Sequence, residues 1–376
     1  MPEIVELQRA DDPRDVIHLA VQRLVEGRVV GLPAENGYVL AALATQPAAV
    51  ADLGRTLALH PSAERLAVLL RGPEEARDYA PALPAIGARL ARRCWPGPVT
   101  LLAPANPGTG LLAALPSAVA HALAHDGWIA LRHVQHDVPT AILRLLPAPL
   151  VVAPVTLRSG EPARNAADIL AAGSQHLDFI VSDGPSRYAQ PPTRIRVEGE
   201  SAAVEVEGVV KASTVQRLSG HIFLFVCTGN TCRSPMAEAL FRKHLADRLR
   251  CSEDQLIERG YVVASAGVAA SLGAPASPEA VEVLAKRGVD LSSHSSQPLS
   301  RKLFAQVDRI WTLTRQHRDA ILRECPEAAS RVELLSRQGG DIPDPIGGGM
   351  DEYVDCANAI EKHVRALVAQ ILPAPP

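Results

Sequence analysis

Short apolar runs alternate with amphipathic stretches along the first 215 residues. Helical spacing of apolar positions predicts helices over 11–26 and 47–57. Continuous apolar runs predict buried strands over 29–33, 66–70, 99–103, 129–132, 150–153 and 179–182. Strands and helices in this succession predict a mixed α/β sheet with helices packed on it.

A second alternating series follows a short polar stretch at 213–220, where we place a domain boundary. Residues 221–226 predict a strand, and residues 236–245 predict a helix with Pro235 at its first position. Another helix is expected from 276 to about 287, and another strand over 307–314. Because 376 residues are enough for two cores, we expect two domains, 1–215 and 221–372.

Between that strand and its helix lies the segment 227–235, with the sequence CTGNTCRSP. Five residues separate Cys227 from Arg233, which is enough to curl a loop around a tetrahedral anion. Loop N–H groups and the helix N-terminus would point at the anion, and Arg233 would close the ring with a charged fork. The same field favours a thiolate at Cys227. The alternative is a buried cysteine beside a surface arginine on an ordinary strand-to-helix turn.

Three small or polar residues within the segment fit the same interpretation. Gly229 permits a tight path, and Asn230 tolerates a left-handed backbone better than most residues. Ser234 is placed to hydrogen-bond the thiolate and help it leave in a second step. The segment therefore predicts a phosphate cradle with a nucleophile at its base.

The segment resembles the phosphate-binding loop of the low-molecular-weight protein-tyrosine phosphatases, C-x5-R-S. The resemblance continues through 264–268, 276–296 and 307–314 to an Asp344-Pro345 pair, and it covers about 221–372. It implies a doubly wound, four-stranded parallel sheet. It also implies a cysteine-dependent protein phosphatase that needs no cofactor or metal and acts on phosphorylated proteins.

The resemblance also assigns roles to residues of this chain. Cys227 would attack phosphorus and form a phosphocysteine intermediate, Arg233 would bind the equatorial oxygens, and Asp344 would act as general acid and then base. Ser265 and His294 would brace the loop together with Asn230. The remaining phosphate-binding positions are Thr228, Gly229, Thr231, Cys232 and Ser234. Cys232 either forms the family's protective disulfide with Cys227 or fills space behind the loop.

The string CTGNTCRSPMAE is similar to that of the protein arginine phosphatase branch, which has threonine at the position of Thr231. The glycines after Asp344 also match that branch, whereas Ile346 replaces its aromatic residue. Phosphoarginine is therefore the expected substrate, and phosphotyrosine is the alternative. Arsenate reduction is not expected, because Leu299 and Gln306 stand where that chemistry needs cysteines.

The first domain carries a second resemblance, on the segment Trp95-Pro96-Gly97-Pro98 and on fragments at 31–40, 158–161 and 182–184. These are similar to the YrdC/Sua5 family, the threonylcarbamoyl-AMP synthases of tRNA modification, over about 10–215. A buried indole in an ordinary turn is the alternative for the tryptophan segment. Polar positions of the family's site are lost at 33–40, at 155–160 and at 58–61, where Ala58 and His60 stand for two cations. We expect the fold without the synthase activity.

Composition restricts the remaining possibilities. A net charge of −3 argues against a strong nonspecific grip on nucleic acid, and no apolar run is long enough to span a bilayer. Six scattered cysteines without a C-x-x-C pair make a metal site or a disulfide framework unexpected. A thiolate enzyme belongs in a reducing compartment, so we expect a cytoplasmic protein. The alternative function is a nucleotide- or double-stranded-RNA-binding protein, or an active tRNA-modification enzyme, with a fused phosphatase.

Overall fold

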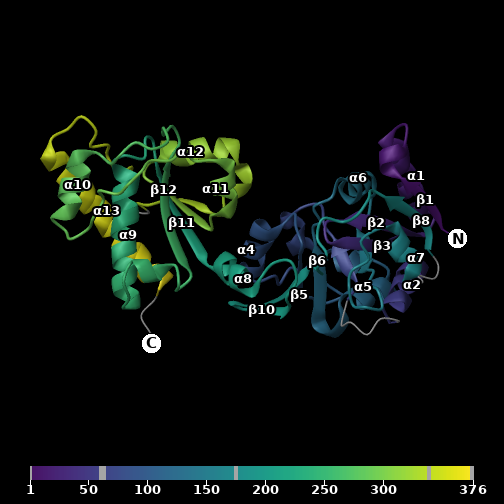
Figure 1. The fold of residues 1–376 in the computed structure, drawn as a ribbon. Coiled ribbons are helices and arrows are strands. Elements are labelled where there is room, and N and C mark those ends of the chain that lie inside the picture. The colour runs from purple at the N-terminus through teal and green to yellow at the C-terminus, as the bar shows by residue number, and fades with distance from the viewer. Residues whose placement is uncertain (1, 59–64, 173–176, 337–339, 373–376) are drawn as a thin grey trace. The chain divides into compact units, whose positions relative to one another are not determined.

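The computed structural model describes residues 2–58, 65–172, 177–336 and 340–372 (Figure 1). The chain divides into two compact units, residues 1–219 and 220–376, called here the N-terminal and C-terminal units. Each unit has its own sheet and its own apolar core.

The N-terminal unit is built on one large mixed sheet. Its strands are β1 (Glu3–Glu6), β2 (Val29–Ala34), β3 (Gly37–Leu43), β4 (Ala67–Leu69), β5 (Val99–Pro104), β6 (Trp128–Arg132), β7 (Leu150–Pro154), β8 (Leu177–Ser182), β9 (Thr193–Glu198) and β10 (Ser201–Val206). Its helices are α1 (Pro13–Val25), α2 (Pro47–Ala58), α3 (Ala76–Tyr79), α4 (Ala85–Cys94), α5 (Ser117–Leu123), α6 (Asp137–Leu145), α7 (Ala166–Ala171) and α8 (Ala212–Ser219). Within the described residues the strand order is β1-β8-β2-β3-β7-β4-β6-β5-β9-β10.

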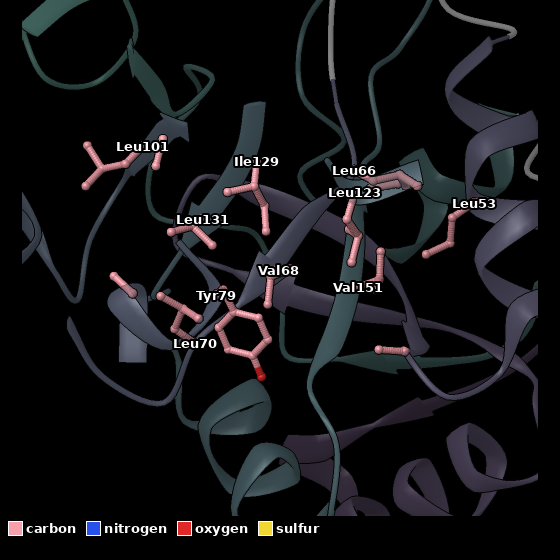
Figure 2. Close-up of a cluster of buried hydrophobic side chains, with 14 of the residues drawn as sticks. Leu53, Leu66, Val68, Leu70, Tyr79, Leu101, Leu123, Ile129, Leu131 and Val151 are labelled. Atoms are coloured by element: carbon pink, nitrogen blue, oxygen red, sulfur yellow. The ribbon is translucent and has the colours of Figure 1, made fainter. Parts of the chain in front are cut away.

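Both faces of this sheet are covered in its centre. Every residue of β2 and β3 is buried, and alternate side chains enter two different cores. Leu32 shares a core with residues of α1 and α6, whereas Leu40 shares the other core with residues of α2. Figure 2 shows the second of these cores, where Val68 of β4 and Val151 of β7 meet the helices. This two-sided burial explains why the strands are continuous apolar runs.

The C-terminal unit is a four-stranded parallel sheet within its described residues. Its strands are β11 (His221–Cys227), β12 (Tyr261–Gly267), β13 (Arg309–Thr312) and β14 (Val332–Leu334). Its helices are α9 (Arg233–Leu249), α10 (Pro278–Ala285), α11 (Arg301–Gln306), α12 (Arg315–Glu324) and α13 (Met350–Ile371). The strand order is β12-β11-β13-β14, so the chain changes direction across the sheet at β11. Ligands of open α/β sheets bind beyond the carboxyl ends of the strands at such a point.

Alternation along β11 fixes the two helix layers of this unit. Phe223 and Phe225 face a core shared with α9, α10 and α13, and Figure 1 shows α9 and α13 side by side. Leu224 and Val226 face a smaller core with residues of α11 and α12. Four aromatic rings lie behind the end of β11, with centroids 5.3 to 5.8 Å apart in the pairs among Phe223, Phe225, Phe241 and Trp311. Each such pair contributes about 0.5–1.5 kcal/mol beyond its burial, which holds the strand end rigidly.

The fold class is the one the sequence predicts, one helix start is wrong, and several strands were not predicted. Helix α9 begins at Arg233 rather than at Pro235, because the N–H groups of a first turn have no intrahelical partner and a proline is tolerated there. The polar stretch 213–220 lies mostly in helix α8, which buries Val215. Strands β1, β3, β9, β10 and β14 were not expected.

Candidate active site

The cradle begins where β11 ends. Cys227 is the last residue of that strand and only 3% exposed, and α9 begins six residues later at Arg233. The intervening residues 228–232 form a bend without regular structure. Asn230 has a φ of 56°, the left-handed conformation that turns the chain back toward the helix. The aromatic layer under β11 thus fixes one end of the loop, and the helix fixes the other.

Most amides of this loop have no protein acceptor. No described residue accepts a hydrogen bond from the backbone N–H groups of Thr228, Gly229, Thr231 or Cys232. The first turn of α9 adds further unpaired N–H groups and the positive end of the helix dipole. Unpaired donors gathered around a cysteine define a binding site for an anion.

The sulfur of Cys227 has two polar contacts inside the loop. Ser234 Oγ lies 2.9 Å from it, and the backbone N–H of Asn230 donates to it at 3.3 Å. The Ser234 hydroxyl also lies 3.3 Å from the carbonyl oxygen of Ala266. The Asn230 N–H donates to the sulfur, and the Ser234 hydroxyl is within donating distance of it, an arrangement that suits a thiolate.

Asn230 is the hydrogen-bonding centre of the loop and is fully buried. Its Nδ2 donates to Ser234 Oγ at 3.0 Å and to Ser265 Oγ at 2.8 Å, and its Oδ1 accepts from the N–H of Gln297 at 2.8 Å. His294 Nε2 lies 2.8 Å from the Asn230 carbonyl oxygen. The structure therefore brings Ser265 and His294 to the loop, although they are far away in sequence.

The network continues to a half-buried carboxyl group. Ser265 Oγ donates to Glu238 Oε2 at 2.6 Å, from the second turn of α9. Burial raises the pKa of Glu238, and the bond from Ser265 opposes that shift. Glu238 was missed in the sequence, where a charged residue in a helix is usually solvated.

Arg233 and Asp344 meet at the mouth of the cradle. Arg233 Nη2 donates to Asp344 Oδ2, and its Nη1 donates to the carbonyl oxygen of Ile342 at 3.3 Å. The guanidinium is 5% exposed, and its buried Nε has no protein partner among the described residues. One donor of the fork is therefore left for another oxygen, while the Asp344 side chain remains 41% exposed.

Cys232 is buried in the apolar core next to α13. Its sulfur is 3.4 Å from Tyr353 Oη of α13 and 3.6 Å from Thr231 Oγ1. Burial, and next the contact with Cys232, raises the pKa of Tyr353 to about 12. All six cysteines are free, and burial raises the pKa of Cys356, which lies under the Asp344 loop, to about 12.

His317 is a second residue that sequence reasoning missed. It lies in the first turn of α12, is 4% exposed, and its Nε2 is 2.9 Å from Thr228 Oγ1. Burial, and next the charge of Arg233, lowers the pKa of His317 to about 4. The signal in the sequence was a threonine three residues earlier, since Thr314 caps the helix through the His317 N–H.

In the N-terminal unit, several residues of the segments that resemble the YrdC/Sua5 family form hydrogen bonds or ion pairs with other groups of the protein. Trp95 is buried, and its Nε1 donates to the Val99 carbonyl oxygen at 2.8 Å. The Thr193 hydroxyl donates to the Val210 carbonyl oxygen and accepts two backbone N–H groups. Glu35, in the turn between β2 and β3, is paired with Arg132 at 3.3 Å. The side chains expected to differ at 58–61 lie outside the described residues.

The N-terminal unit also has a cleft of about 180 Å³ next to a smaller one of about 40 Å³. Arg132 and Arg194 line both, and Arg65 lines the smaller one. Arg132 is buried with an Nε that has no partner among the described residues, and its Nη2 also donates to Asn36 Oδ1 at 2.7 Å. Within the part of the chain that is described, no set of three His, Cys, Asp or Glu side chains is placed to hold a metal ion. No described helix has both the length and the apolarity that crossing a bilayer requires.

The C-terminal unit, which contains this site, matches a known protein family. The model of the low molecular weight phosphotyrosine protein phosphatase family matches residues 222–373. A protein-arginine-phosphatase of Bacillus subtilis (strain 168) is 38% identical over 152 residues, which are 39% of this chain and 95% of that protein. A low molecular weight protein-tyrosine-phosphatase of Streptomyces coelicolor is 35% identical, over 39% of this chain and 91% of that protein. The chain belongs to the low molecular weight phosphotyrosine protein phosphatase family, through its C-terminal unit.

Solved structures and a second family model complete the comparison. The YwlE arginine phosphatase from Geobacillus stearothermophilus is 35% identical over 40% of this chain and 92% of that chain, with a TM-score of 0.35. Wzb from Vibrio vulnificus in complex with benzylphosphonate is 31% identical over 40% of this chain and 98% of that chain, with the same TM-score. Residues 22–206 match the Sua5/YciO/YrdC family model, described as telomere recombination. Both family resemblances predicted from the sequence are confirmed.

Proposed function

We propose that the C-terminal unit hydrolyses phosphoarginine on proteins through a phosphocysteine at Cys227. The observation that carries this proposal is the ring of unpaired amides around the sulfur, closed by Arg233 with a free Nε. A phosphoryl dianion fits this ring because the loop amides are donors and Arg233 is positively charged. The site needs no metal, since Arg233 and the amides supply the positive field.

The reaction follows from the positions of three side chains. Cys227 Sγ attacks phosphorus, the S–P bond forms, and the P–N bond of phosphoarginine breaks. Asp344 gives its proton to the departing guanidine nitrogen. Asp344 then takes a proton from water, whose oxygen attacks phosphorus and releases Cys227 and inorganic phosphate. Ser234 stabilises the departing thiolate, being 2.9 Å from the sulfur.

In the free protein Asp344 is paired with Arg233. A bound phosphoryl group would take Arg233 as its partner, and this frees the exposed Asp344 carboxyl group to meet the leaving group. The acid and the phosphate site are thus kept together before substrate arrives. The pairing also supports Asp344, rather than a neighbouring carboxylate, as the proton donor.

The preference for phosphoarginine rests on Thr231. Thr231 is a loop residue whose Oγ1 lies 3.6 Å from the Cys232 sulfur. Its small polar side chain leaves room for the group that is bonded to the phosphoryl group of the substrate. The relatives named protein-arginine-phosphatase support this choice. Ile346 is 68% exposed just after Asp344, and an aliphatic side chain there cannot stack on a guanidinium as an aromatic ring does. Phosphotyrosine therefore remains the alternative substrate.

A side-by-side assay of phosphoarginine and phosphotyrosine peptides tests both the role of Cys227 and the substrate preference. Cys227→Ser is expected to abolish turnover, and the matched change Cys251→Ser, just beyond the end of α9, is expected to retain it. Thr231→Ile is expected to move the preference toward phosphotyrosine, because a larger aliphatic residue suits an aromatic ring. Equal phosphotyrosine rates before and after this change would defeat the specificity argument.

For the N-terminal unit we propose that it keeps the synthase fold without synthase turnover and binds a nucleotide or RNA phosphate in its arginine-lined cleft. Arg132, Arg194 and Arg65 line the two adjoining cavities, which supports an anionic ligand. The polar groups at 193 and 35 are engaged within the protein, which speaks against catalysis there. Calorimetric titration with ATP, threonine and bicarbonate tests this. Formation of a threonylcarbamoyl adenylate would overturn it.

We also propose that the protein works in the cytoplasm, because free buried thiols at the active site need a reducing compartment. Fractionation of cells that express the full chain tests this location. Recovery of the protein outside the cytoplasmic fraction would contradict it.

A further inference from the structure

His317 is held between two hydroxyl groups on opposite sides of its ring. Its Nδ1 lies 2.9 Å from Thr314 Oγ1, and its Nε2 lies 2.9 Å from Thr228 Oγ1. The ring is 4% exposed, whereas Thr228 is exposed at the rim of the cradle, directly after Cys227. An otherwise buried imidazole therefore reaches the mouth of the site through one hydroxyl.

The hydrogen-bond partners of His317 accommodate a neutral ring whose proton is on Nε2. Thr314 Oγ1 already accepts the backbone N–H of His317 at 3.3 Å, so its single proton is free to donate to Nδ1. The neutral ring then carries its proton on Nε2 and donates it to Thr228 Oγ1. The lowered pKa of His317, caused by burial and next by Arg233, agrees with a neutral ring. Arg233, Asp344 and Asp341 are the charged groups that act on it.

The direction of the hydrogen bond from His317 determines whether the Thr228 hydroxyl can donate its own proton elsewhere. An oxygen that accepts from His317 keeps its own proton for a partner on another side. The exposed face of Thr228 lies at the rim of a ring that includes the N–H groups of Gly229, Thr231 and Cys232, which have no acceptor among the described residues. A donor at the rim would complete that ring toward a phosphoryl oxygen.

We propose that His317 is a positioning residue that turns the Thr228 hydroxyl into a hydrogen-bond donor to the substrate's phosphoryl group. The inference rests on the proposed function, because it requires the cradle to bind a phosphoryl group. Thr228 contacts the phosphoryl oxygen, and His317 acts only through Thr228. Thr314 sets the ring tautomer from the start of α12.

Inorganic phosphate binding to the full chain tests this without relying on turnover. The dissociation constant is measured from the protection that phosphate gives Cys227 against alkylation. Thr228→Val is expected to weaken phosphate binding by about tenfold or more, the usual effect of losing a hydrogen bond to a charged group. Thr228→Ser and His317→Gln keep a donor at each position and are expected to stay within about threefold of the parent chain.

A double variant separates positioning from mere bracing of the loop. His317→Phe with Thr228→Val removes both partners and leaves no buried N–H without an acceptor, so the urea midpoint of the C-terminal unit should stay near that of the parent. We expect phosphate binding in this variant to be as weak as in Thr228→Val alone. Parental phosphate affinity in a stable double variant, or in Thr228→Val, would overturn the proposal.

The parent chain distinguishes this result from failure of the proposed function. If the parent binds phosphate but hydrolyses neither phosphopeptide, the proposed function is wrong, and the Thr228 and His317 results still decide the positioning proposal. If the parent is active and the variants bind phosphate normally, only the positioning proposal fails.

Discussion

Asn230 offers the sharpest test of how the loop is held together. Asn230→Ala removes three hydrogen bonds of the buried amide, to Ser234, Ser265 and Gln297. At roughly 0.5–1.5 kcal/mol each, their loss costs about 1.5–4.5 kcal/mol. Alanine also lacks asparagine's tolerance of a φ of 56°, which adds about 1 kcal/mol. The expected loss in the free energy of unfolding of the C-terminal unit is therefore about 2.5–5.5 kcal/mol.

Asn230→Gly separates the two contributions. Glycine loses the same hydrogen bonds but accepts the left-handed backbone, so it should be about 1 kcal/mol more stable than Asn230→Ala. Urea titration of the full chain, read by pulse proteolysis and mass spectrometry of the fragments, assigns each midpoint to one unit. Asn165→Ala, which removes the N-cap of α7, is the matched control and should lower only the N-terminal midpoint.

Two results would refute this reasoning. Equal stability of the alanine and glycine variants would show that the left-handed backbone carries no strain in alanine. A loss below about 1 kcal/mol in both would show that the buried amide network does not stabilise the loop. In either case the conformation of the loop would have to be held by β11 and α9, which flank it, without a contribution from Asn230.

Two further changes test neighbouring features. The pKa of His317 is lowered to about 4 in the folded protein, so the unfolded chain takes up this proton first as the pH falls below about 6.5. Between about pH 7 and pH 5, the parent should lose about 2 kcal/mol of stability relative to His317→Gln, and a pH-independent difference in urea midpoints would contradict this. Gly267→Ala would place a Cβ 2.4 Å from the Thr228 carbonyl oxygen and should abolish protection of Cys227 by phosphate, whereas Gly54→Ala, with open space around it, should not. Retained protection in Gly267→Ala would show that the loop tolerates this displacement.

The sequence pattern predicted those elements whose contacts lie within a few residues of one another. The apolar run at 221–226 and the spacing from Cys227 to Arg233 were enough to place the cradle at a strand end, because those contacts lie within a few residues. Strand β3 was missed, although its residues form a largely apolar run that is buried on both faces of the sheet. Strands β9 and β10 form an antiparallel pair that is partly exposed. Their register depends on pairing across the sheet.

The groups that were missed in the site act over long sequence separations. His317 contacts a residue 89 positions earlier, and Tyr353 contacts Cys232, which is 121 positions earlier. Thr314 marks the start of the helix that carries His317, but no neighbouring residue indicates the contact with Thr228, and none indicates the contact of Tyr353 with Cys232. Asp344 was placed only by resemblance, and the Ile342 N–H, which donates to the Leu313 carbonyl oxygen just after β13, helps to hold it near Arg233.

Trapping the covalent intermediate tests the central claim most directly. The full chain with Asp344→Ala is mixed with a phosphoarginine peptide, quenched within the first turnover, and analysed by mass spectrometry of its proteolytic fragments. The fragment that contains Cys227 should gain one phosphoryl group, and Cys227→Ser in the same background should show none on a cysteine. Turnover of substrate by the parent without phosphate ever appearing on Cys227 would contradict the account.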